Sequence, residues 1–311
     1  MAGHLLLAVL SFLVYFHAAY SVITAQQMLG AVAQFSSDFT WPRIEQIAAE
    51  INYTGFTPDG MSTLPTRGSA VLSPTTSTVI GRVDVTNSYE GRELNTEYIF
   101  GLFASVGNIN TTRLLGVPGN ATITELAINP PIISFSSLRS FDWGPVTIPI
   151  QTDVWFLFDN ASGLIAQYDI TFRRLEWAWD YIKPFLQPQL EQELGSLAGK
   201  CKDVDGLMHL RAAIDICQQH EVYCTGSLQQ YNSTQACLDF VYNQTPMGKV
   251  YEWGGDTAMC RYIHKGMIPY RPQVHCPHIG PSGGGMCIKR NYINETTQNL
   301  YPIPFLPLAL G

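Results

Sequence analysis

The cysteines are confined to one part of this chain. All seven lie between positions 201 and 287 of the 311 residues, and none precedes them. In an oxidising compartment, seven thiols form at most about three bridges and leave one thiol over. The sequence therefore predicts a cross-linked C-terminal region, leaves the pairing open, and allows a disulfide-linked dimer through the odd cysteine. The seven are Cys201, Cys217, Cys224, Cys237, Cys260, Cys276 and Cys287.

The first residues are typical of a secretory signal peptide. An apolar stretch runs from Leu5 to Phe16, and small and polar residues follow it. This stretch is shorter than the roughly 20 apolar residues that a membrane-spanning helix needs. We expect residues 1–25 to form the signal, with cleavage after Ser21 or Ala25, and the mature protein to be secreted and extracellular with no membrane span.

Seven sequons for N-glycosylation are consistent with passage through the secretory pathway, although each alone is weak evidence. We expect some of them to carry glycans that serve solubility and folding. They lie at Asn52, Asn110, Asn120, Asn160, Asn232, Asn243 and Asn294.

The charge balance argues against one class of partner. The chain has a formal net charge of −7 and a pI near 5.4. Nucleic-acid binding requires clustered Lys and Arg to neutralise phosphates, and the sequence has no such cluster. We therefore expect no nucleic-acid partner.

Apolar periodicity divides the chain before the cysteines into helical and extended segments. A helix is predicted from Pro42 to about Asn52, a loop over 57–76, and an apolar segment over 98–106 that is either strand or buried helix. Alternating patterns predict strands, the clearest being a hairpin in which turn residues 159–163 join two β-rich runs. The predicted strands lie at 77–86, 122–128, 132–138, 146–158 and 164–172.

The region after the hairpin is predicted to be helical and then irregular. A helix from Arg174 to Ile182 is expected to break at Pro184 and Pro188. Short helices are expected over 204–217 and 234–242, and irregular structure with little core of its own over 251–292. We therefore expect a domain over 26–195 and a cysteine-rich region over 196–311.

The order helix, loop, strands and long aromatic hairpin resembles the NTF2-like or SnoaL-like superfamily over residues 40–185. The hairpin sequence Phe158-Asp-Asn-Ala-Ser-Gly-Leu-Ile-Ala-Gln-Tyr-Asp169 carries the resemblance. It implies an α+β fold in which a curved antiparallel sheet forms a cone around a pocket. The block from Cys260 to Cys287 resembles cysteine-rich extensions of uncharacterised fungal secreted proteins. The superfamily includes isomerases, dehydratases, cyclases and binding modules, so fold alone does not select a function.

The hairpin carries the candidate catalytic residues. Asp153, Tyr168 and Asp169 would act at the pocket of such a cone, with Trp155 lining it. A carboxyl group in an apolar pocket has a raised pKa and can transfer a proton. Alternatively, these carboxylates cap turns or pair with a neighbouring arginine. Asp153 and Trp155 share one face of their strand, and only one face can form the pocket.

Three histidines form the candidate metal site. His264, His275 and His278 lie close in sequence among the cysteines, and imidazoles so placed can bind a divalent metal such as zinc. We expect instead that they satisfy backbone groups in a crowded disulfide-linked region, with no cofactor, and a divalent metal such as zinc is the alternative.

Two functions remain open. The first is a secreted glycoprotein with a pocket for a small apolar ligand, in a binding or structural role without turnover. The second is a lyase, isomerase or cyclase that acts on a small apolar metabolite through a pocket Asp or His.

Overall fold

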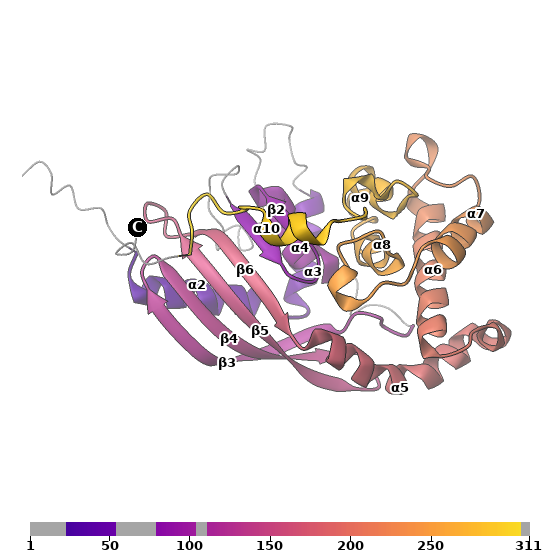
Figure 1. Cartoon of the computed structure of the whole chain (residues 1–311), viewed down its shortest axis with the longest axis horizontal. Helices are drawn as coiled ribbons and strands as arrows, with labels where there is room; N and C mark the ends of the chain where they lie inside the picture. Colours follow the sequence, from indigo (N-terminus) through magenta and orange to yellow (C-terminus); the bar gives the residue numbers. More distant parts are fainter. Residues whose placement is uncertain (1–22, 54–78, 104–110, 306–311) are drawn as a thin grey trace, which may run out of the picture.

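A six-stranded sheet organises the first half of the chain (Figure 1). The computed structural model describes residues 23–53, 79–103 and 111–305. The strand order is β2-β1-β6-β5-β4-β3, in which β1 and β6 are parallel and every other pair of neighbours is antiparallel. The strands are β1 (Ile80–Val83), β2 (Ser88–Glu90), β3 (Val117–Asn129), β4 (Ile132–Asp142), β5 (Thr147–Phe158) and β6 (Ile165–Arg173).

The predicted hairpin is confirmed as β5 and β6, with Val154 opposite Ile170. Its turn is fixed by Asp159, which accepts hydrogen bonds from the backbone of Ala161 and Ser162. Gly163 has a φ of 71°, a left-handed conformation that favours glycine. The predicted loop over 57–76 lies outside the described residues.

Three N-terminal helices pack on the inner face of this sheet: α2 (Ala25–Asp38), α3 (Arg43–Tyr53) and α4 (Arg92–Phe100). The Thr24 side chain caps α2 in a capping box with Gln27. Apolar side chains at a helical spacing, Met28, Val32 and Phe35, join one core cluster with inner-face residues of the sheet. The segment over 98–106, which was open between strand and helix, is helical in its described part.

The expected break at two prolines is wrong. Helix α5 runs without interruption from Leu175 to Leu194 and contains both Pro184 and Pro188. Both prolines are exposed, so water can solvate the carbonyls that lose their hydrogen bonds. The opposite face buries apolar side chains four residues apart, and this packing outweighs the local cost. These are Ile182, Leu186, Leu190 and Leu194.

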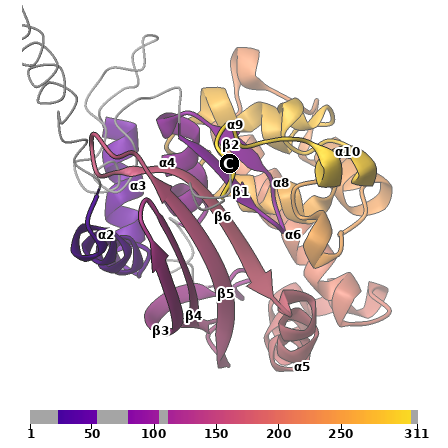
Figure 2. The ribbon, with the colours of Figure 1, turned by 60° about the vertical axis from the view of Figure 1, so that its left-hand side comes forward.

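The cysteine-rich region is helical, and the expectation of irregular structure over 251–292 is corrected. Its main helices are α6 (Val204–Tyr223), α7 (Thr234–Leu238), α8 (Ala258–Lys265), α9 (Pro272–Ile279) and α10 (Tyr292–Thr297). Figure 2 shows the long strands curving between α2 and α3 on one side and α6, α8 and α9 on the other. The region also has a core, because Ile216, Met259 and Ile263 are buried in a cluster that includes Phe141 and Ile150 of the sheet.

The chain after α10 returns to the sheet (Figure 1). The Tyr301 hydroxyl donates to the carbonyl of Tyr168, and Gln167 exchanges two hydrogen bonds with the backbone of Ile303. This segment therefore covers the outer face of β6. Among the described residues, no helix combines the length and hydrophobicity needed to cross a membrane.

Candidate functional site

A cavity of about 130 Å³ lies on the inner face of the sheet. Alternate residues of β5, Ile150, Thr152 and Val154, point into it because successive side chains of a strand face opposite sides. Trp253 and Ile263 of the cysteine-rich region also line it. Both halves of the chain therefore form its wall.

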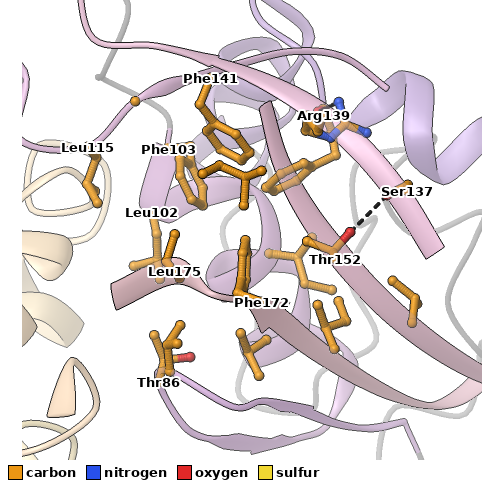
Figure 3. A pocket seen from close by; sticks show the side chains of 18 of the residues that line it. Thr86, Leu102, Phe103, Leu115, Ser137, Arg139, Phe141, Thr152, Phe172 and Leu175 are labelled. Carbon is orange, nitrogen blue, oxygen red and sulfur yellow. Dashed lines mark hydrogen bonds between the residues drawn. The ribbon is translucent and has the colours of Figure 1, made fainter. Parts of the chain in front are cut away.

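Aromatic rings dominate this wall. Figure 3 shows Phe103, Phe141 and Phe172 pointing toward one another around the cavity. Trp179 and Trp253 meet edge to face, with ring centroids 5.1 Å apart. Such a surface favours an apolar ligand that contains rings, since aromatic pairs prefer offset or edge-to-face contact. The aromatic lining comprises Phe35, Phe39, Tyr98, Phe103, Phe135, Phe141, Trp143, Phe172, Trp179 and Trp253.

The charged group in the wall is already satisfied. The buried guanidinium of Arg139 donates to the carbonyls of Ser36, Phe39 and Gly119 and to the Thr40 hydroxyl. Burial lowers the pKa of Arg139 to about 10. Because this value is still well above 7, the side chain is cationic at neutral pH. Arg139 thus fastens α2 to the sheet.

The cavity offers little acid–base chemistry. The hydroxyls of Ser137 and Thr152 bond to each other at 2.8 Å (Figure 3). Among the described residues, no Asp, Glu, His, Cys or Lys lines the cavity. The phenol of Tyr98 is the remaining titratable group besides Arg139. The wall is therefore almost entirely apolar.

Asp153 and Trp155 lie on the outer face of β5, and the expectation that they flank the pocket is corrected. Asp153 accepts a 2.6 Å hydrogen bond from Ser136 and pairs with Arg173. The Trp155 side chain is 44% exposed, and its ring meets that of Phe305. Strand alternation separates the two faces but does not indicate which one is covered.

Tyr168 and Asp169 lie on opposite faces of β6. Asp169 pairs with Arg82 on the outer face. Tyr168 is buried on the inner face against Gly81, where an added Cβ would lie 1.8 Å from the ring. Tyr168 does not contribute to the cavity wall. The structure thus brings none of the four hairpin candidates to the cavity.

The three predicted histidines do come together. His264 lies on α8, and His275 and His278 lie three residues apart on α9, a spacing that puts them on one face. The Nδ1 atom of His264 is 3.3 Å from Nδ1 of His275 and 3.3 Å from Nδ1 of His278. All three side chains are buried.

Two residues of α4 join this cluster, and sequence reasoning missed both roles. Glu97 pairs through one oxygen with Arg271, and its other oxygen lies 3.7 Å from Nε2 of His275. The Tyr98 hydroxyl lies 3.4 Å from Nδ1 of His264. Because Tyr98 also lines the cavity, one side chain separates the cavity from the histidine cluster.

The cluster is electrostatically unusual. Burial lowers the pKa of His264 well below its ordinary value, and it lowers that of His278 to about 4, with His275 adding to the effect. Burial alone would raise the pKa of Glu97, but the interactions with His275 and Arg271 outweigh it and the net shift is downward. At neutral pH, His264 and His278 are therefore neutral and Glu97 is ionised.

Three disulfides cross-link the region: Cys217–Cys237, Cys224–Cys276 and Cys260–Cys287. Cys201 is free and half-buried, with its sulfur 3.7 Å from the Tyr242 hydroxyl. Cys260 and Cys287 lie near His264, but their sulfurs are bonded to each other and offer no thiolate.

The sequons differ in accessibility. Asn160 is half-buried, and Asn110 and the side chain of Asn52 lie outside the described part of the chain. Four are exposed: Asn120, Asn232, Asn243 and Asn294.

The fold and the cavity define an α+β protein in which a disulfide-linked helical region helps to close a cavity on one face of a six-stranded sheet. Residues 65–170 match the BfoA N-terminal domain and residues 174–290 match the BfoA family C-terminal domain. The chain belongs to the BfoA family.

Two curated relatives are similar over most of their length. "Aurasperone B biosynthesis cluster protein A" of Aspergillus niger is 35% identical over 89% of this chain and 83% of its own. "Bifonsecin B biosynthesis cluster protein A" of Aspergillus brasiliensis is 35% identical over 89% of this chain and 85% of its own. A solved SnoaL-like polyketide cyclase from Jannaschia is 10% identical, with a TM-score of 0.32 over 49% of this chain and 90% of its own.

Proposed function

We propose that this protein binds a small apolar molecule with aromatic rings in the cavity of the cone, without turning it over. The observation that carries the proposal is the wall itself, where aromatic side chains surround a space with few polar groups. The polar side chains in this wall are already hydrogen-bonded within the protein, as shown for Arg139, Ser137 and Thr152. An apolar cavity of about 150 Å³ accepts benzene, and this cavity, of about 130 Å³, has nearly the size needed for one aromatic ring.

The relatives indicate the origin of the ligand. Two of them carry the name of a biosynthesis cluster protein. We infer that the ligand is a product or intermediate of small-molecule biosynthesis, and that this chain holds it away from water. Burial of apolar surface supplies the affinity, at roughly 25 cal/mol per Å².

We place this activity outside the cell. The three disulfides favour an oxidising compartment, and the exposed sequons are accessible to glycosylation. The protein would then be a secreted glycoprotein that carries or stores its ligand. A dimer linked through Cys201 is compatible with the free thiol.

A second candidate function is a cyclase, isomerase or lyase. It is favoured by one contact, the hydrogen bond between the Tyr98 hydroxyl in the cavity wall and His264 behind it. A phenol held by an imidazole can exchange a proton with a bound ligand. In that case, Tyr98→Phe abolishes turnover of a biosynthetic intermediate but preserves its binding.

Benzene binding tests the primary proposal. Isothermal titration calorimetry of the secreted protein with benzene should show saturable binding. Val154→Phe places a larger side chain in the cavity and takes space from the ligand, so the affinity should fall about tenfold or more, which corresponds to about 1.4 kcal/mol or more. Thr171→Phe on the exposed outer face is the matched control and should bind as the wild type does. Equal affinity in all three proteins would refute the cavity as the binding site.

A further inference from the structure

Hydrogen bonding explains only one of the contacts that His264 makes through its Nδ1 atom. Three groups approach its Nδ1 atom: His275 Nδ1 at 3.3 Å, His278 Nδ1 at 3.3 Å and the Tyr98 hydroxyl at 3.4 Å. A ring nitrogen has either one proton or one lone pair, so it completes one hydrogen bond. The other approaches place nitrogen atoms side by side in a buried space, where unmatched polar groups cost free energy.

We propose that His264, His275 and His278 bind one divalent transition metal ion, zinc or copper, through their Nδ1 atoms. Zinc–nitrogen bonds are about 2.0–2.1 Å long, and in a tetrahedron they place two ligand nitrogens about 3.3–3.4 Å apart. The two Nδ1 separations from His264 have this value. All three ligand atoms lie within 4.8 Å of one another.

Glu97 provides the carboxylate partner that metal-binding histidines usually have. Such a histidine donates its second ring N–H to a carboxylate, which fixes the tautomer and leaves the other nitrogen free for the metal. His275 directs Nδ1 to the cluster and Nε2 to the Glu97 carboxylate, 3.7 Å away. Both the Nε2 atom and that carboxylate oxygen are buried without a hydrogen-bond partner among the described residues. Arg271 holds the other oxygen of Glu97.

The ligands are held on a cross-linked frame. Cys260 lies one turn before His264 on α8 and is bonded to Cys287, and Cys276 follows His275 and is bonded to Cys224. The segment Gly283–Gly285 packs against the imidazole of His278, since a Cβ added at Gly284 would lie 2.7 Å from Cδ2 of that ring. The frame therefore fixes the imidazoles before metal arrives, which reduces the conformational cost of binding.

Tyr98 is positioned to supply a fourth ligand. Three imidazoles leave one tetrahedral position open, and the Tyr98 hydroxyl is 3.4 Å from a ligand nitrogen. Tyr98 also lines the apolar cavity, so the metal lies one side chain behind the cavity wall.

Metal content provides the test. The secreted chain, purified without a histidine tag and without chelators, is loaded with zinc or copper and dialysed against metal-free buffer. Mass spectrometry of the elements should find about one ion per chain, as in a three-histidine site. Cobalt should give the intense visible absorption of tetrahedral coordination, and copper a nitrogen-split electron paramagnetic resonance signal, which together distinguish the geometry and the preferred ion.

Variants locate the ion. His278→Asn should retain less than about a tenth of the wild-type metal, and Glu97→Gln, which keeps the ligands, should lower the affinity about 10- to 100-fold. His209→Asn is the matched control, because this histidine bonds to the carbonyl of Val241 away from the cluster, and it should bind metal normally. Circular dichroism checks folding. Wild-type protein that retains no metal and shows no thermal shift with zinc or copper would overturn the proposal, as would an equal loss in the His209 variant.

Discussion

The cavity and the histidine cluster share Tyr98 but differ in whether their buried polar groups have hydrogen-bond partners. In the cavity wall, the Arg139 guanidinium meets backbone carbonyls, and the hydroxyls of Ser137 and Thr152 meet each other. In the cluster, His275 and Glu97 each keep a buried polar atom without a hydrogen-bond partner among the described residues. Because buried polar groups in folded proteins are nearly always paired, this difference is what the two proposals, an apolar ligand in the cavity and a metal ion in the cluster, set out to explain.

The largest expected effect tests how completely the cavity wall satisfies itself. Arg139→Met removes the donor for the carbonyls of Ser36, Phe39 and Gly119. We expect the free energy of unfolding to fall by about 3–5 kcal/mol, since each buried carbonyl left unpaired costs about 1–3 kcal/mol. Urea denaturation measures this change in the free energy of unfolding. Arg173→Met, at an exposed ion pair, is the control and should cost about 1 kcal/mol or less.

The next effect tests the frame around the cluster. The double change Cys224→Ala and Cys276→Ala opens a bridge between positions 52 residues apart. We expect a loss of about 2–4 kcal/mol in the free energy of unfolding. Cys201→Ala removes the free thiol and should change stability by about 0.5 kcal/mol or less. A similar loss in both proteins, again measured in urea, would show that the bridge does not stabilise the fold.

A smaller, pH-dependent effect comes from His220. Its Nε2 atom accepts a 2.9 Å hydrogen bond from the backbone N–H of Gln230, and the N–H of Tyr231 also points toward it at 3.2 Å. Burial lowers the pKa of His220, with Glu221 partly opposing the shift. The unfolded chain therefore takes up this proton first as the pH falls below about 6.5. Stability is full above that pH and declines below it.

His220→Gln isolates this contribution, because its side-chain oxygen can accept the same bonds without titrating. The wild type should lose more thermal stability than the variant between pH 7.5 and pH 5. Parallel pH profiles for the two proteins would contradict the assignment.

The smallest effect tests the outer face of the sheet. Asp153→Asn keeps the shape of a side chain that bonds Ser136 and Arg173. We expect stability to change by about 1 kcal/mol or less, as for exposed ion pairs, and benzene affinity to stay unchanged. A clear loss of ligand binding would show that Asp153 contributes to the pocket after all.

The fold was largely predictable where the local signals agreed. The hairpin over 153–172 combined alternation with turn residues, and the cysteines marked the cross-linked region. Prediction failed at α5, where buried apolar side chains every four residues overrode Pro184 and Pro188. It also failed over 251–292, because short helices between glycines and prolines have weak local patterns.

The candidate site was predictable only where its members are close in sequence. His264, His275 and His278 span fifteen positions and were found together. Glu97 and Arg271 are 174 positions apart, and no local pattern connects them. Strand alternation placed Asp153 and Trp155 on one face of β5 but did not indicate which face packs against helices.

The contribution of Trp253 and Ile263 to the cavity wall has a consequence for comparisons within the family. A chimera that exchanges residues 174–290 between two members replaces part of the lining, although the sheet stays the same. Ligand preference should therefore depend on both segments. A larger aromatic side chain on one side of the cavity must be matched by a smaller side chain on the opposite side.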